Sequence, residues 1–132
     1  MLKKDFILRI LEQFAKDLAV FLAGRSGKGD EDESFGVFYT RYLQKEGSFF
    51  YESDIDAIRA FINEQPDDRR LAYMEMLAEL LYQDAPIHLE PVTHADLYEK
   101  SLALLEWLDE ESKTYSLDRQ DRMALIKLEL EK

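Results

Sequence analysis

The sequence has no cysteine among its 132 residues and no long apolar run. The first absence excludes disulfide frameworks, cysteine-ligated zinc, iron–sulfur clusters and thiol nucleophiles. The longest stretches without Asp, Glu, Lys or Arg, residues 18–24 and 34–40, are much shorter than the roughly 20 mostly apolar residues of a membrane-spanning helix. Charged residues also interrupt the N-terminal segment in which a secretory signal would lie. We therefore predict a cytoplasmic protein that does not bind membranes.

Basic residues are few relative to acidic ones. The 17 Lys and Arg residues stand against 28 Asp and Glu residues, which gives a formal net charge of −11. Nucleic acids and the cytoplasmic leaflets of membranes are themselves negatively charged, so this balance disfavours both as partners. It favours another protein or a peptide with a basic segment, which the acidic surface would attract.

The composition, with 46% hydrophobic and 34% charged residues, is that of a globular chain. Its length predicts one helical domain over residues 1–132. Apolar residues recur at spacings of three and four in six segments, which predicts amphipathic helices. These predicted helices span residues 2–23, 35–43, 55–62, 67–83, 94–108 and 117–128.

Three segments between these helices lack the helical spacing. Residues 24–34 predict a flexible acidic loop, and residues 84–93, which hold two of the three prolines, predict a connector. Residues 48–52 include three aromatic residues in a row and predict a short extended linker. The expected helix N-caps are Ser53, Thr93 and Ser116.

The fold class follows from the type of element that the pattern predicts. No segment shows sustained alternation of apolar and polar residues, and no βαβ unit can be drawn. Six amphipathic helices joined mostly by short links predict an all-α fold. We expect antiparallel hairpins, arranged as a right-handed array or as a bundle.

Two short segments resemble known proteins. Residues 98–105 read Tyr-Glu-Lys-Ser-Leu-Ala-Leu-Leu, an order that resembles the second helix of a tetratricopeptide (TPR) repeat, in which the small residue lets the paired helix approach. Residues 1–14 resemble the first helix of small bacterial proteins of unknown function that continue into TPR-like helices. These resemblances imply divergent TPR-like hairpins, a bacterial cytoplasmic origin and recognition of extended or helical peptides without chemistry. They supply no catalytic residue.

One short stretch combines residue types that bind metals or transfer protons. It contains His88, Glu90, His94 and Asp96. Histidine titrates near neutral pH, and both imidazole and carboxylate groups bind metals. The spacing matches no zinc signature, so we predict no metal, cofactor or catalytic residue here. A metal-binding or hydrolytic enzyme that uses His88 and His94 is the alternative hypothesis.

Aromatic residues are concentrated between positions 35 and 51. Seven of the 16 aromatic residues of the chain (1 Trp, 7 Tyr and 8 Phe) lie in this segment. One helix face and a short linker can hardly bury all seven, and exposed Tyr and Phe side chains are typical interface anchors. We therefore predict a non-catalytic adaptor or self-associating domain with an aromatic-rich surface. Internal packing of the aromatics, and a homodimer through the first or last helix, are left open. The predicted partner-binding residues are Tyr39, Tyr42, Phe49, Phe50 and Tyr51.

Overall fold

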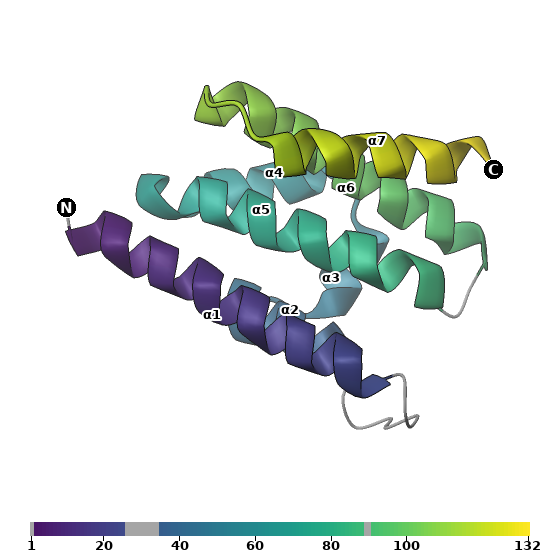
Figure 1. Cartoon of the computed structure of the whole chain (residues 1–132), viewed down its shortest axis with the longest axis horizontal. Coiled ribbons are helices and arrows are strands. Elements are labelled where there is room, and N and C mark those ends of the chain that lie inside the picture. The colour runs from purple at the N-terminus through teal and green to yellow at the C-terminus, as the bar shows by residue number, and fades with distance from the viewer. Residues whose placement is uncertain (1, 26–34, 89–90) are drawn as a thin grey trace.

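The computed structural model describes residues 2–25, 35–88 and 91–132. Over these segments the chain is all-α, with seven α-helices, one 3₁₀ turn and no strand (Figure 1). The elements are α1 (Leu2–Arg25), α2 (Phe35–Leu43), α3 (Gly47–Glu52), α4 (Ile55–Asn63), α5 (Asp67–Asp84), η1 (Ala85–Ile87), α6 (Pro91–Ser112) and α7 (Leu117–Glu131). The predicted fold class is confirmed.

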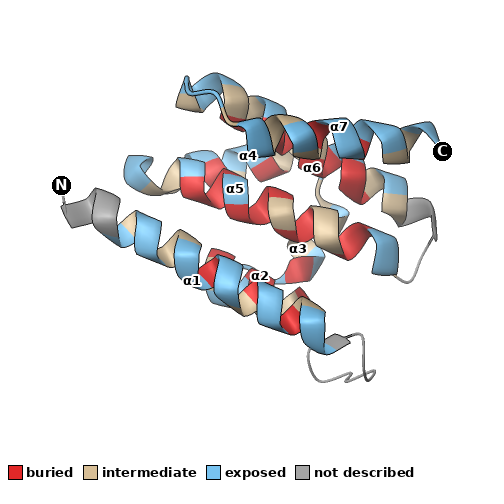
Figure 2. Ribbon diagram, viewed as in Figure 1, coloured by how far each residue is buried: buried red, intermediate tan, exposed pale blue. Residues whose placement is uncertain are grey.

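Helix α5 lies at the centre of the arrangement and contacts α1, α2, α4 and α6. Helices α5, α6 and α7 follow one another as two antiparallel hairpins, and α1 lies beside α5 on the side away from α7 (Figure 1). Buried residues are concentrated on α5 and on the helix faces turned toward it, whereas the outer faces of α1 and α7 are largely exposed (Figure 2). The described helices therefore form a bundle around one central helix.

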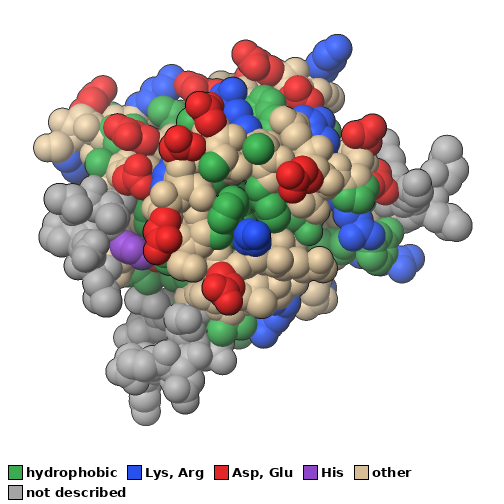
Figure 3. Space-filling model, turned by 180° about the vertical axis from the view of Figure 1, so that it is seen from behind, with side chains coloured by type: hydrophobic (Ala, Val, Ile, Leu, Met, Phe, Trp, Pro, Cys, Tyr) green, Lys and Arg blue, Asp and Glu red, His purple; other side chains and the backbone are tan. Residues whose placement is uncertain are grey.

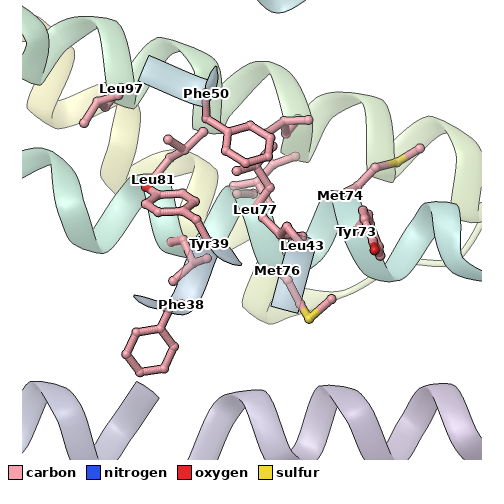
Figure 4. Close-up of a cluster of buried hydrophobic side chains, with 14 of the residues drawn as sticks. Phe38, Tyr39, Leu43, Phe50, Tyr73, Met74, Met76, Leu77, Leu81 and Leu97 are labelled. Carbon is pink, nitrogen blue, oxygen red and sulfur yellow. The ribbon is translucent and has the colours of Figure 1, made fainter. Parts of the chain in front are cut away.

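The core is built mainly from α5 and the aromatic residues packed on it. Buried positions cover most of the circumference of α5, and the face with Leu71, Glu75, Glu79 and Tyr82 remains open or half-open. Tyr39, Leu43 and Phe50 reach α5 from α2 and α3 and meet Leu77 and Leu81 (Figure 4). Each such side chain contributes about 1.5–3 kcal/mol when fully removed from water, so this cluster holds the short helices onto the bundle.

The segment predicted to be an extended linker, residues 48–52, is instead part of helix α3. Its central residue, Phe50, packs against the rings of Tyr39, Phe49 and Phe61 at centroid distances of 5.5, 5.2 and 5.6 Å. Helical geometry places Phe50 in this cluster, and the gain from burying it outweighs the β propensity of three consecutive aromatic residues. Packing on distant helices decides the conformation of this segment.

Several predicted boundaries differ from the structure. Gly24 does not end the first helix, because α1 continues to Arg25; the rest of the predicted acidic loop, residues 26–34, lies outside the described residues. Asp54, rather than Ser53, caps α4, since its carboxylate accepts a hydrogen bond from the Ala57 amide at 2.9 Å. A carboxylate one position later reaches the free amides that the serine hydroxyl does not.

The predicted connector at residues 84–93 is shorter than expected. Asp84 is the last residue of α5, the 3₁₀ turn η1 follows it directly, and α6 begins at Pro91 rather than after Thr93. Proline suits the first position of a helix, where its missing amide hydrogen costs nothing. The Ser116 cap of α7 is confirmed, because its hydroxyl accepts a hydrogen bond from the Arg119 amide at 3.2 Å. No helix of the described segments combines the length and apolar character needed to cross a membrane.

Candidate functional site

The predicted aromatic surface is largely internal. The side chains of Tyr39 and Phe50 are 0% exposed, so neither presents a surface to a partner in this structure, and their role in partner binding stays a prediction. Tyr42, Phe49 and Tyr51 are half-buried and pack against the core. Helix α2 directs Tyr39 and Tyr42 toward the core, and helix α3 directs the other three rings toward it; this is the internal packing that the sequence left open. A contact role for the three half-buried residues stays a prediction.

Three of the polar groups in this region converge on a buried carboxylate, that of Asp84 at the end of α5. Its oxygen Oδ2 accepts hydrogen bonds from the hydroxyls of Tyr39 at 3.0 Å and Tyr51 at 2.5 Å. The His88 Nδ1 atom lies 3.5 Å from Oδ1. Burial raises the pKa of both tyrosines well above the ordinary value, and the charge of Asp84 adds to this effect. These contacts fasten α2 and α3 to the turn between α5 and α6.

Lys100 is a buried cation on α6 that holds the end of α3. Its Nζ atom donates hydrogen bonds to the carbonyl oxygens of Phe50 and Tyr51, both at 3.0 Å, and lies 2.8 Å from a carboxylate oxygen of Asp96. The last carbonyls of a helix have no partner within the helix and carry partial negative charge. A buried ammonium group at that position satisfies them, so Lys100 has a clear structural role.

The two histidines lie close together but do not form an open site among the described residues. His94 Nε2 is 2.6 Å from the carbonyl oxygen of His88, and the His88 ring packs on Tyr51 with a centroid distance of 4.5 Å. Histidine atoms reach the surface at one edge of the back face, next to acidic side chains (Figure 3). Glu90, the fourth member of the predicted cluster, lies outside the described residues. Within residues 2–25, 35–88 and 91–132, no group of three His, Asp or Glu side chains could hold a metal.

An open groove lies between α1 and α7, which flank α5 in Figure 1. Its volume is about 610 Å³. One wall comes from α1, the opposite wall from α7 and the residue before it, and the floor from α5 and α6. Its lining residues are Leu11, Phe14, Ala15, Leu18, Ala19, Leu22, Glu75, Ala78, Glu79, Leu105, Leu108, Ser116, Asp118, Arg119, Asp121, Arg122 and Leu125.

The α1 wall of the groove is entirely apolar. Leu11, Ala15, Ala19 and Leu22 follow one another at spacings of four, four and three, which places them along one stripe of the helix. Ala15 and Ala19 are exposed, and the two leucines are half-buried. Across the groove, Leu125 of α7 is 47% exposed. The groove thus exposes apolar side chains on both of its walls.

The charged residues of the groove leave an excess of negative charge. Both arginines already have partners: Arg122 Nη1 lies 2.7 Å from Glu79 Oε1, and Arg119 Nη2 lies 2.8 Å from an oxygen of Asp109. The Arg122 guanidinium also lies 3.9 Å from the ring centre of Tyr82. These contacts fix both arginines on the α7 side of the groove.

Three carboxylates remain in the groove without a hydrogen bond or ion pair to any described residue: Glu75, Asp118 and Asp121. Partial burial raises the pKa of Glu75, Arg119 lowers it and Glu79 raises it further. All three side chains are exposed, so a cationic group of a partner could reach them from solvent and pair with them. The groove combines an apolar wall with unpaired negative charge.

The sequence contained part of the signal for this groove. Leu11, Leu18 and Leu22 stand at helical spacing within residues 2–23 and so predict one apolar helix face, but a pattern does not show how much of that face other helices cover. Leu125 of α7 lines the groove and is 47% exposed, whereas the exposed Leu117 and Leu128 lie outside it. Only the packing of α1 and α7 on opposite sides of α5 shows that their apolar residues border one groove.

A scan against protein-family models gave no match, and searches of curated proteins and of solved structures found no similar protein.

Proposed function

We propose that this chain is a non-catalytic helical protein–protein interaction domain that binds an amphipathic helix of another protein in the groove between α1 and α7. The main support is that one open groove combines an apolar wall with three carboxylates that make no hydrogen bond or ion pair to a described residue. Amphipathic helices dock by placing apolar residues at i, i+3, i+4 and i+7 into such grooves. The TPR-like resemblance points to the same kind of ligand.

The size of the groove supports a helix face as the ligand. A volume of about 610 Å³ lies within the range of about 300–1,000 Å³ that is typical of ligand pockets. A whole helix is roughly 10–12 Å across with its side chains, so only one of its faces would enter. Leu11 and Leu22 would contact its apolar anchors, and the other faces of the bound helix would remain in solvent.

The charge of the groove specifies the partner further. Glu75 lies on the floor, while Asp118 and Asp121 line the α7 wall. Lys or Arg residues beside the apolar anchors of the partner would pair with these carboxylates, while acidic residues at the same positions would be repelled. The net charge of −11 would also accelerate the approach of a basic segment.

A synthetic peptide provides a defined probe. We would use an amphipathic helix of about 18 residues, or about 27 Å, with Leu along one face and Lys elsewhere, labelled for fluorescence anisotropy. Ala19→Arg and Leu125→Arg introduce bulk and positive charge inside the groove at exposed positions. Each is expected to weaken binding by about tenfold or more, as loss of a central contact does.

Matched controls place the same arginine just outside the groove. Val20, next to Ala19, is 73% exposed, and Leu128, one turn from Leu125, is 57% exposed; neither lines the groove. Val20→Arg and Leu128→Arg should change the affinity by less than about twofold. Equal weakening by both members of a pair would mean that the peptide binds only to the overall charge, and would overturn the proposal.

A second copy of the chain is the other occupant to be tested. Light scattering on the unliganded protein would distinguish it from a foreign helix. A dimer that is dissociated by Ala19→Arg and not by Val20→Arg would show that the groove is a self-association surface, and would replace the proposed partner. A monomer at all concentrations, together with peptide binding in the groove, would support the proposal.

A further inference from the structure

A second hollow lies between α1, α2 and α5, nearer the N-terminal end of α1 than the groove. Its volume is about 200 Å³, which is much smaller than the volume of about 610 Å³ of the groove. Its lining residues are Ile7, Ile10, Arg41, Tyr42, Gln44, Arg69, Ala72, Tyr73 and Met76. Four of these side chains are apolar and form one part of the wall, and the remaining ones carry polar groups.

The charge of this hollow is opposite to that of the molecule. Among the residues whose side chains the structure describes, the charged ones that line it are Arg41 and Arg69 and none is acidic, although the chain has 28 Asp and Glu against 17 Lys and Arg. Arg41 lies 3.9 Å from Asp17, which is at the limit of an ion pair. Arg69 forms no ion pair with any residue of the described segments. Its guanidinium lies only over the ring of Phe6, 5.5 Å from the centroid.

Tyr73 supplies a hydroxyl group next to Arg69. Its side chain is 6% exposed overall, and its hydroxyl makes no hydrogen bond to a described residue. Every fully buried polar side-chain atom of the described residues has a partner, so this hydroxyl keeps some exposure, and Tyr73 is one of the residues that line the hollow. The ring points from α5 toward the side on which α1 lies (Figure 4). Burial raises the pKa of Tyr73, and the positive charge of Arg69 opposes this rise.

The positions of these donors follow from the geometry of α5. Arg69, Tyr73 and Met76 are spaced by four and three residues, so they lie along one stripe of the helix. The Arg69 guanidinium and the Tyr73 hydroxyl, both hydrogen-bond donors, thus lie on the same face of α5 as Met76. Ile7 and Ile10 of α1 lie opposite, one helical turn apart. The hollow therefore has a polar end that can donate hydrogen bonds and an apolar wall.

We propose that this hollow binds the carboxylate of a small molecule with a short apolar body. The carboxylate would accept hydrogen bonds from the Arg69 guanidinium and the Tyr73 hydroxyl, a charge-assisted arrangement that is stronger than one between neutral groups. The apolar body would pack on Ile7, Ile10 and Met76. A volume of about 200 Å³ equals about seven water molecules at roughly 30 Å³ each, so a short chain fits and a long one does not.

The test is a titration with hexanoate, followed through the backbone amide signals of the protein by NMR. We expect saturable shifts at Ile10, Ala72 and Met76, and none along the groove between α1 and α7. Hexanamide, which has the same shape and no charge, should bind about tenfold more weakly. N-acetyl-leucine serves as a second carboxylate, because it resembles the C-terminal end of a peptide. Tighter binding of hexanoate would indicate a short free acid as the ligand, and tighter binding of N-acetyl-leucine would indicate a peptide end.

Two variants and one control locate the binding. Arg69→Gln and Tyr73→Phe should each weaken hexanoate binding by about fivefold or more. Arg59→Gln is the control, since Arg59 is on α4 and its guanidinium lies 5.4 Å from the ring centre of Trp107. Melting curves show whether each variant is folded, and Arg41→Gln offers a second probe at the polar end. Equal binding of hexanoate and hexanamide, or unchanged binding in both Arg69→Gln and Tyr73→Phe, would overturn the proposal.

Discussion

Gly47, the first residue of α3, is required by the close approach of Tyr39. A Cβ atom at position 47 would lie 3.1 Å from Tyr39 Cδ2 and 3.4 Å from Tyr51 Cε2. Tyr39 cannot retreat, because it is fully buried and its hydroxyl is bound to Asp84. A single added methyl group would therefore have to displace a fixed ring.

We predict that Gly47→Ala destabilises the protein by about 1–2 kcal/mol, although alanine favours helices. Gly24→Ala is the matched control, since nothing lies within 4 Å of the added Cβ atom and Gly24 is in α1. It should stabilise the protein by up to about 1 kcal/mol through helix propensity. Urea denaturation measures both. A stabilising Gly47→Ala would show that Tyr39 is free to move.

Lys100 is the second residue whose contribution to stability a substitution can test. Lys100→Met keeps the length of the side chain but leaves the carbonyl oxygens of Phe50 and Tyr51 without their donor. We expect a loss of about 2–4 kcal/mol in the free energy of unfolding. The exposed residue Lys127 provides the control, and Lys127→Met should change stability by less than about 0.5 kcal/mol. Similar small effects of both changes in urea denaturation would contradict the role given to Lys100.

Tyr42 makes the stability depend on pH in the alkaline range. Burial raises its pKa to about 12, and the hydrogen bond to Asp17 adds to this. The folded state therefore keeps the proton at pH values at which the unfolded state, with a tyrosine pKa of about 10, has lost it. The resulting contribution to stability is complete below about pH 10 and is lost as the pH rises through about 12.

We predict that Tyr42→Phe reduces the loss of stability between pH 9 and pH 11.5, because it removes this proton. Tyr115→Phe, at a position that is 76% exposed, is the control and should leave the pH dependence of the parent protein unchanged. Urea midpoints measured across the range test both variants. If the loss of stability is as steep in Tyr42→Phe as in the parent, then Tyr42 does not hold its proton in the folded state.

Among the elements, α4 offers a direct comparison between the predicted cap and the observed one. We predict that Asp54→Ala costs about 1 kcal/mol, because the Ala57 amide loses its acceptor. Ser53→Ala, which removes the residue that the sequence favoured as the cap, should cost less than about 0.5 kcal/mol. Thermal melting distinguishes the two. A larger loss for Ser53→Ala would restore the original assignment.

Helices with a long apolar stripe were predictable, because their periodicity reports the face that they bury. The six predicted segments correspond to α1, α2, α4, α5, α6 and α7, with shifted ends. Helix α3 was missed because Gly47–Glu52 is too short to show a period. Its helical form depends on Tyr39 and Lys100, which are distant in sequence.

Ser101 is the small residue of the segment 98–105. It is fully buried between α6 and α5, and its Oγ atom donates a hydrogen bond to the Ala78 carbonyl oxygen at 2.7 Å.

At the scale of the whole molecule, the location of the candidate site was not predictable. Aromatic density indicated an interface around Phe50, but the bundle buries Tyr39 and Phe50 completely. The groove depends on the packing of α1 and α7 on opposite sides of α5. The smaller hollow depends on Arg69 of α5 and Ile10 of α1 lining the same space. Composition did indicate the sign of the groove, since the negative balance of the chain continues into it.

The most direct test of the central proposal is to map the Leu/Lys helical peptide on the protein by NMR, through the change in each backbone amide signal at saturation. If the peptide binds in the groove, we expect the largest changes in the amide signals of Leu11, Ala15, Ala78 and Leu125, and small changes in those of α3 and α4. Changes centred on α3 and α4, or scattered over all acidic surfaces, would contradict a helix-binding groove between α1 and α7.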